Sequence, residues 1–225
     1  MKKIVFIMMA MLMAVIPSTA QNYKHSKYYN QKTGHLDYGF NNKGVDTYYG
    51  IRIGPGFSYV TSDDSRLDGG DWQTGLNVGV VAGFPLTYSD PLYLETGLYY
   101  IEKGGKKSLG GGKKMTYDLN YLEIPVVVKY KYEIDDDLTI EPFAGGYFAA
   151  GVGGKIKNFA AREAQSSFRS DNFRRLDGGL RIGCGIGYDM FYADLTYDIG
   201  LANICHDTFD KARNRAVMLN FGVNF

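Results

Sequence analysis

The sequence predicts an all-β fold, an eight-stranded antiparallel up-and-down transmembrane β-barrel. Three observations favour it: eight stretches with period-2 alternation, connections that alternate between short and long, and an unusual composition. The 225 residues include 29 Gly, 19 Tyr and 13 Phe but only 6 Pro, which suits strands and turns better than helices. The net charge of +1 gives no global basic field, so nucleic acid is not an expected partner.

Residues 1–20 have the pattern of a secretory signal peptide. Lys2 and Lys3 precede an apolar run over residues 4–16, and small residues follow it up to Ala20, where we expect cleavage. This run is too short to cross a bilayer as a helix, which takes ~18 residues or more. We therefore expect the mature chain to enter a membrane only as strands.

Residues 21–47 are expected to form a periplasmic N-terminal extension, because they are polar and show no sustained alternation. His25, His35 and Asp37 are metal-binding residue types, but no regular element fixes them in one place. A solvated tail is the favoured interpretation. No metal site and no cofactor are predicted.

The first four strands follow from alternation between an apolar face and a face of glycine, tyrosine or charge. Residues 48–60 set tyrosine, isoleucine and phenylalanine against glycine and arginine. Residues 74–88 set leucine and valine against glycine. Residues 92–101 set leucine against glutamate and tyrosine, and residues 121–132 set leucine, isoleucine and valine against glutamate and lysine.

The last four strands complete an even number, which lets the sheet close without unpaired edges. Residues 138–152 alternate least cleanly, and we expect Glu141, with two aromatic residues, on their inner face. Residues 179–189 set isoleucine and leucine against glycine. Residues 191–199 set aromatic and aliphatic side chains against aspartate, and residues 215–225 alternate up to a final phenylalanine.

The lengths of the connections predict which end of the barrel faces the periplasm and which faces the cell exterior. Outer-membrane barrels have short periplasmic turns and long extracellular loops, with both chain ends in the periplasm. The short connections lie at residues 89–91, 133–137 and 189–190, and the long ones at residues 61–73, 102–115, 153–177 and 202–214.

Alternation alone does not decide whether the apolar face meets lipid or the barrel interior. An apolar interior would make a soluble, secreted, lipocalin-like ligand-binding barrel, which is one alternative. Glycine on the other face favours the membrane, because glycine makes room inside a narrow barrel but weakens a water-facing strand. We therefore expect Leu76, Val126, Ile182 and Leu219 to point outward.

Charged side chains on the glycine-rich face predict an ion network in the lumen. Eight strands leave room for side chains but for no wide channel. Because an unpaired buried charge is costly, we expect a salt-bridged lumen with little conductance. The predicted network comprises Arg52, Glu95, Glu123, Lys129, Lys131, Glu141, Arg181, Asp189, Asp194 and Asp198.

The last strand resembles the terminal signal that the barrel-assembly machinery of bacteria reads during insertion. Its apolar positions include Leu219, Phe221, Val223 and Phe225. The resemblance implies that this machinery is a partner during insertion and that outer-membrane lipid surrounds the folded barrel.

Two of the predicted long loops are basic. One carries Lys103, Lys106, Lys107, Lys113 and Lys114, and the other carries Lys155, Lys157, Arg162, Arg169, Arg174 and Arg175. Such cations could contact lipopolysaccharide phosphates or an acidic envelope protein, since charge-assisted contacts are strong. Of these, Lys106, Lys107, Lys113 and Lys114 are the candidate anion-contacting residues. The alternative is an ordinary solvated loop.

A second alternative is a lipid-modifying barrel enzyme with its catalytic groups at the outer rim. His206 lies beside Asp207 in the last long loop, and Ser108, Ser166 and Ser167 are candidate nucleophiles. Nothing in the sequence fixes their distances. An exposed loop histidine is the favoured interpretation, so we predict no enzyme activity and no catalytic residue.

Three segments resemble the PorT-like outer-membrane β-barrel family. They are residues 121–130, which read Y-L-E-I-P-V-V-V-K-Y, residues 50–54, which read G-I-R-I-G, and residues 219–225. The resemblance covers residues 48–225 and implies a small eight-stranded barrel in the cell outer membrane. Some members are linked to protein secretion. We therefore expect a structural or surface-interaction role, linked to secretion or envelope assembly.

Overall fold

The computed structural model describes residues 47–63, 71–87, 90–108, 114–135, 137–158, 162–168, 173–205 and 211–225. No helix in these ranges is long and apolar enough to span a bilayer. The same ranges contain eleven strands: β1 (Tyr48–Ser62), β2 (Gln73–Pro85), β3 (Leu92–Ser108), β4 (Lys114–Tyr130), β5 (Tyr132–Asp135), β6 (Leu138–Gly153), β7 (Lys155–Asn158), β8 (Arg162–Ser166), β9 (Leu176–Tyr188), β10 (Phe191–Gly200) and β11 (Ala212–Asn224).

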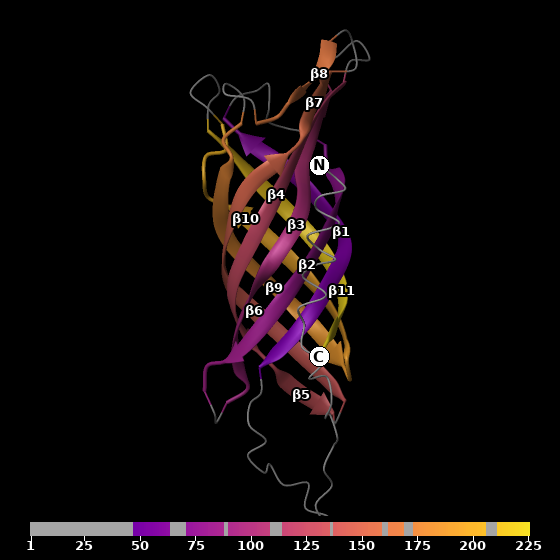
Figure 1. Ribbon diagram of the computed structural model, residues 1–225, viewed down its shortest axis with the longest axis vertical. Helices are drawn as coiled ribbons and strands as arrows, with labels where there is room; N and C mark the ends of the chain where they lie inside the picture. Colours follow the sequence, from indigo (N-terminus) through magenta and orange to yellow (C-terminus); the bar gives the residue numbers. More distant parts are fainter. Residues whose placement is uncertain are drawn as a thin grey trace, which may run out of the picture. The chain divides into compact units, whose positions relative to one another are not determined.

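Eight of these strands form a closed antiparallel barrel, as predicted (Figure 1). Around the barrel their order is β1, β2, β3, β4, β6, β9, β10 and β11. The β4–β6 pairing joins the two halves of the sheet, and β11 pairs back with β1 from Gly50↔Asn224 to Ser62↔Ala212. Closure gives the backbone groups of every barrel strand a partner on both sides, which lipid demands.

The three short strands extend the ends of the barrel. β5 pairs with β6 at the end where the short turns lie, here called the turn end. β7 follows β6, pairs with the first residues of β4 and forms a hairpin with β8 at the opposite end, here called the loop end. Figure 1 shows β5 and the β7–β8 hairpin at opposite ends of the barrel.

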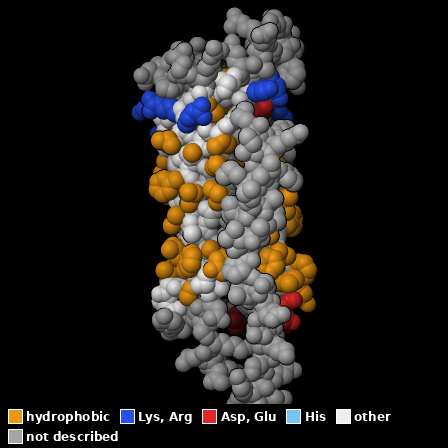
Figure 2. Space-filling view, in the orientation of Figure 1, with side chains coloured by type: hydrophobic (Ala, Val, Ile, Leu, Met, Phe, Trp, Pro, Cys, Tyr) orange, Lys and Arg blue, Asp and Glu red, His pale blue; other side chains and the backbone are white. Residues whose placement is uncertain are grey.

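The apolar face of the barrel points outward. Leu76, Val126, Ile182 and Leu219 are 44%, 40%, 47% and 38% exposed. Figure 2 shows the hydrophobic side chains as a belt around the middle of the visible face. Exposed aliphatic and aromatic side chains in such a belt are suited to hydrocarbon, so the soluble lipocalin-like alternative is wrong.

Inward glycines lie beneath aromatic rings of the neighbouring strand. A Cβ atom added at Gly79 would lie 2.5 Å from Cγ of Tyr99, its register partner on β3. A Cβ atom at Gly183 would overlap the ring of Phe143, its partner on β6. Glycine therefore provides the space in which large side chains fill a narrow barrel.

The fifth predicted strand has the expected facing. Glu141, Phe143 and Tyr147 are buried in the lumen, whereas Ile140 and Phe148 are exposed on the outer face. The alternation of this strand is weak in sequence because small residues occupy several positions on both faces.

The long loops are shorter than predicted. The expected loop 102–115 is mostly strand, since β3 runs to Ser108 and β4 starts at Lys114. The expected loop 153–177 contains the β7–β8 hairpin. Beyond the bilayer both faces of a strand meet water, so the ladder continues without the apolar alternation on which the prediction relied.

Candidate functional site: a closed lumen and two charged rims

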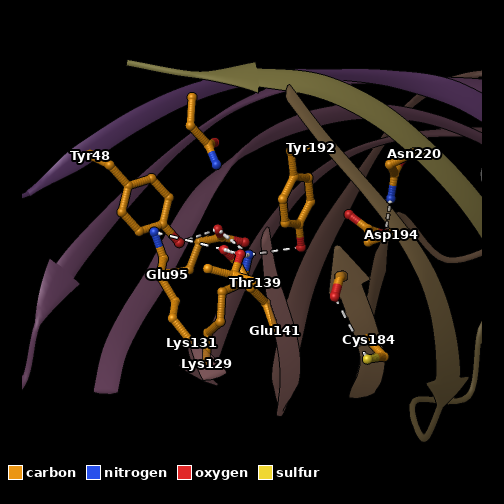
Figure 3. A network of polar contacts seen from close by, with 12 residues as sticks. Tyr48, Glu95, Lys129, Lys131, Thr139, Glu141, Cys184, Tyr192, Asp194 and Asn220 are labelled. Carbon is orange, nitrogen blue, oxygen red and sulfur yellow. Dashed lines mark hydrogen bonds and ion pairs between the residues drawn. The ribbon is translucent and has the colours of Figure 1, made fainter. Parts of the chain in front are cut away.

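A group of ions near the turn end, here called the turn-end cluster, consists of Arg52, Glu95, Lys129, Lys131 and Glu141. Figure 3 shows side chains of this cluster converging from several strands. Lys129 Nζ lies 2.7 Å from Glu95 Oε2 and 3.4 Å from Glu141 Oε2. Arg52 lies 4.0 Å from Glu95, and Lys131 lies 3.9 Å from Glu141. Lys129 is therefore the centre of the cluster.

Two tyrosines complete the contacts of the turn-end cluster. The hydroxyl of Tyr48 donates to Glu95 Oε2 at 2.6 Å, and Lys129 Nζ donates to the hydroxyl of Tyr192 at 2.9 Å. The guanidinium of Arg52 stacks 3.9 Å from the centroid of the Tyr192 ring. Cation–π contact and hydrogen bonding together replace water around these buried charges.

A second group, the loop-side cluster, consists of Lys103, Glu123, Arg181 and Asp198. Lys103 Nζ lies 2.7 Å from Glu123 Oε2 and 3.0 Å from Asp198 Oδ2. Arg181 Nε lies 2.7 Å from Asp198 Oδ1, and the same side chain also pairs with Glu123. The two cations and two anions balance, which a buried cluster needs because any surplus charge would lack solvent.

Polar side chains lie inside the barrel wall beside these clusters. Asp194 accepts hydrogen bonds from Thr196 Oγ1 at 2.6 Å and from Asn220 Nδ2 at 2.7 Å. Asn214 Nδ2 donates to Asp177 Oδ2 at 2.7 Å. Amides and a hydroxyl thus bind Asp194 and Asp177, two carboxylates that lie outside the two clusters.

An apolar plug closes the lumen at the loop end. It combines barrel residues with residues that follow β8 and β10, namely Val60, Tyr117, Leu119, Tyr121, Tyr147, Ala149, Phe168, Phe173, Ile204, Cys205 and Ala212. The rings of Tyr117 and Phe173 stack at 5.6 Å between centroids, and those of Tyr121 and Phe168 meet edge to face at 5.7 Å. Lys103 contacts the ring of Tyr147 at 4.2 Å, so the plug lies directly against the loop-side cluster.

The structure places most of the predicted network inside the barrel. Arg52, Glu95, Glu123, Lys129, Glu141, Arg181, Asp194 and Asp198 are all buried. Lys131 is at the edge of the lumen, with 20% of its side chain exposed.

Asp189 does not belong to the network. It is exposed in the two-residue turn between β9 and β10, with φ at 52°. The prediction continued the alternation of β9 one residue beyond its end at Tyr188. Aspartate tolerates the left-handed conformation that a tight turn requires, so the residue has a turn role instead.

Lys103 was assigned to a basic loop, but it is 1% exposed and lies at the heart of the loop-side cluster. Continuing the inward positions of β3 from Glu95 through Tyr99 would have found it, since both share its parity. The candidate Lys106 and Lys107 are partly exposed at the end of β3. Lys113 lies outside the described residues, and only the backbone of Lys114 is described.

The two rims of the barrel differ in charge. At the turn end the exposed charged side chains of the described residues are acidic: Asp90, Glu133, Asp135, Asp137 and Asp189. At the loop end exposed cations prevail: Lys155, Lys157, Arg174, Arg175, Lys211 and Arg213. Figure 2 shows lysine and arginine above the hydrophobic belt and acidic side chains below it.

The candidate catalytic residues are not assembled into a described site. His206 and Asp207 lie outside the described residues, as do residues 1–46, which include the predicted signal peptide, His25, His35 and Asp37. Ser108 and Ser166 are exposed, whereas Ser167 is buried and donates to the carbonyl oxygen of Asp118 at 2.6 Å. That bond holds the hydroxyl of Ser167 in a structural role.

The residues of the proposed insertion signal lie on the outer face of β11. Leu219, Phe221 and Phe225 are exposed, and Val223 is partly exposed. They therefore lie on the surface that meets lipid.

Comparison with solved structures finds small outer-membrane proteins. Ail of Yersinia pestis, in complex with the heparin analogue sucrose octasulfate, is 16% identical, with 80% of this chain and 99% of that chain covered and a TM-score of 0.41. Neisserial surface protein A is 14% identical, with coverage of 80% and 97% and a TM-score of 0.45. OprG of Pseudomonas aeruginosa is 14% identical, with coverage of 82% and 98% and a TM-score of 0.46.

No curated protein matches the sequence. Residues 39–206 match the family model described as outer membrane protein beta-barrel domain. This match covers most of the chain, and it agrees with the closed barrel, the outward apolar belt and the ion-filled lumen. The chain therefore belongs to the family of proteins with this outer-membrane β-barrel domain, and its place is the outer membrane.

Proposed function

We propose that the protein acts through its loop-end rim, as a structural or surface-interaction protein without enzyme activity, and that its lumen is no large pore. The observation that carries this proposal is the closed interior. Two ion clusters and an apolar plug fill the lumen, so the exposed polar chemistry is concentrated at the rims. An eight-stranded barrel is filled by its side chains in this way and leaves no wide path for solutes.

The basic rim supports an anionic partner. Its cations include Lys106 and Lys107 near the end of β3 and Lys155 at the start of β7. With the short turns in the periplasm, this rim faces the outer leaflet and the cell exterior. Lipopolysaccharide phosphates or an acidic envelope protein are the partners that this charge would attract, since Lys and Arg form charge-assisted contacts with both.

The finer family assignment is part of the proposal. The segment Tyr121–Tyr130 and the segment Gly50–Gly54 resemble the PorT-like barrels, some of which are linked to secretion, so we place the protein in secretion or envelope assembly. Residues 1–20 would direct export, and the outer face of β11 would engage the barrel-assembly machinery. A deletion strain with reduced levels of secreted proteins at the cell surface would support this role, and unchanged secretion and envelope composition would contradict it.

Single-channel recording tests the closed lumen. The folded protein in planar bilayers should give no stable, large conductance, because the ion clusters and the plug occupy the pathway. Stable large channels would overturn the proposal. A porin of known conductance, reconstituted in the same bilayers, is the positive control.

Salt dependence tests the rim. Binding of the folded protein to lipopolysaccharide should weaken steeply as salt rises, since exposed charges are screened over ~10 Å at 0.1 M salt. Neutralising the exposed cations of the whole rim with glutamine should weaken this binding, whereas Asp135→Asn at the acidic rim should not. These cations are Lys155, Lys157, Arg174, Arg175, Lys211 and Arg213. Binding that ignores salt, or no binding at all, would contradict a role for the basic rim.

A further inference from the structure

Three cations follow one another on the outer face of β11 at the loop end. Lys211 immediately precedes the strand, and Arg213 and Arg215 occupy its first two outward positions. The inward positions between them, Ala212 and Asn214, are buried. Successive outward residues of a strand are ~7 Å apart, so the three charges form a column ~14 Å long, here called the β11 column.

The β11 column is part of the barrel wall rather than of a loop. Arg215 pairs in register with Tyr59, and Arg213 with Thr61, on the neighbouring strand β1. The ladder continues past the end of β1, where the backbone N–H of Asp63 donates to the carbonyl oxygen of Lys211 at 3.1 Å. The backbone beneath these cations is therefore held by β1 and by the residue that follows it, so their side chains start from fixed points.

The column ends where the hydrophobic belt begins. Directly below Arg215 on the same face of β11 are Val217, Leu219 and Phe221, which meet hydrocarbon. Trp72 lies at this level, with its ring 4.6 Å from the ring of Tyr59, the partner of Arg215. Tryptophan and tyrosine favour the boundary between headgroups and acyl chains. The column thus starts at that boundary and extends outward through the headgroup layer.

A shallow polar cleft of about 260 Å³ lies beside the upper part of the column, between β1 and β11. Its lining includes Lys211, Arg213, Asp63 and the hydroxyl-bearing Thr61. The lining keeps a surplus of positive charge, since it contains two cations, Lys211 and Arg213, and one carboxylate, Asp63. Among the residues that the structure describes, no ion pair engages the side chain of Lys211, Arg213 or Arg215.

We propose that the β11 column binds a phosphorylated headgroup of an outer-leaflet lipid, such as the phosphates of lipid A. This inference rests on the proposed contact between the loop-end rim and lipopolysaccharide, and it assigns that contact to one face of the barrel wall. The cations face sideways at headgroup depth, above an apolar surface that accepts acyl chains. A lipid phosphate is the anion at this depth, and charge-assisted bonds from Arg and Lys are the contacts that it accepts.

Fluorescence of Trp72 offers a direct test, because it is the one tryptophan in the sequence and lies beside the column. The folded full-length protein in neutral detergent micelles is titrated with bis-phosphorylated lipid A. The triple variant Lys211→Gln, Arg213→Gln, Arg215→Gln should bind about 100-fold more weakly, at about fivefold for each cation near the membrane surface. Fully dephosphorylated lipid A should bind the wild type and the triple variant equally.

A matched control carries Lys106→Gln, Lys107→Gln and Lys155→Gln, which remove the same charge from the same rim. The affinity of this control for lipid A should stay within about threefold of the wild-type affinity. A larger loss would indicate that charge across the whole rim contributes to binding. A heat-shift gel verifies that all variants are folded. Equal losses in both triple variants would overturn the column but leave the proposed rim contact intact.

Free phosphate provides the last arm of the experiment. Inorganic phosphate should neither change the emission of Trp72 nor displace lipid A, because the site combines the cations with an acyl-facing surface. Displacement at equal concentration would overturn the assignment to lipid. A wild type that binds no lipid A under any condition would overturn both the column and the proposed lipopolysaccharide contact.

Discussion

The two ion clusters of the lumen use the same chemistry but differ in their access to water. In the loop-side cluster the most exposed side chain, that of Arg181, is 6% exposed, and the plug packs against Lys103. In the turn-end cluster the side chains of Glu95 and Lys131 are 10% and 20% exposed. A sealed cluster must therefore balance its own charges, whereas solvent can compensate part of the charge of an open cluster.

The largest effect is expected from Glu123→Gln. This change removes one of two carboxylates from the sealed cluster and leaves Lys103 and Arg181 with Asp198 alone. Breaking a buried ion pair costs about 3–5 kcal/mol, because the remaining charge is uncompensated. Urea unfolding of the protein in lipid vesicles, followed on heat-shift gels, measures the loss. Glu133→Gln on the exposed rim is the control, and an equal loss in the control would contradict the role of burial.

A smaller effect is expected from Glu95→Gln in the turn-end cluster. Lys129 keeps Glu141 and the hydroxyl of Tyr192, and the side chain of neighbouring Lys131 is 20% exposed. Loss of a hydrogen-bonded partner of charged groups should cost about 1.5–3 kcal/mol. The same unfolding measurement applies. If Glu95→Gln proves as destabilising as Glu123→Gln, exposure is not what separates the clusters.

A charge-balanced double change should be milder still. Lys103→Met together with Glu123→Gln removes one cation and one anion and leaves the Arg181–Asp198 pair intact. Replacing a buried pair with uncharged side chains is often nearly neutral, so we expect a loss of about 1 kcal/mol. A double-mutant cycle on unfolding free energies checks this expectation. Additive losses would show that charge balance is not what the sealed cluster requires.

The smallest effect is expected from Lys131→Met. Its ammonium lies 3.9 Å from Glu141 and 3.7 Å from the centroid of the Tyr48 ring, at the open edge of the lumen. Methionine keeps most of the packing, and partly exposed pairs contribute about 0.5 kcal/mol. The difference in unfolding free energy between Lys131→Met and the wild type should become smaller as the salt concentration rises. A loss above that of Glu95→Gln would place Lys131 among the enclosed ions.

Much of the barrel and part of its ion network could be predicted from sequence. Inward positions such as Arg52 and Glu123 share a face with glycine, and period-2 alternation assigns every residue of a strand to one face or the other. The predicted strand ends were less accurate than the predicted strands. Asp189 lies one residue past β9, and Lys103 lies in a stretch taken as a loop, because alternation carries no information on where a ladder stops.

Period-2 alternation in the sequence predicts the number of barrel strands and the outward apolar face. Lipid imposes these features on each strand separately, and so a local pattern encodes them. The folded structure shows which charges meet, such as Lys103 and Asp198, which are 95 residues apart. It also shows that Phe168 and Phe173 belong to the apolar plug at the loop end. Those contacts join side chains from strands on different sides of the lumen. The stagger between strands determines which side chains meet, so the pattern of one strand does not predict these contacts.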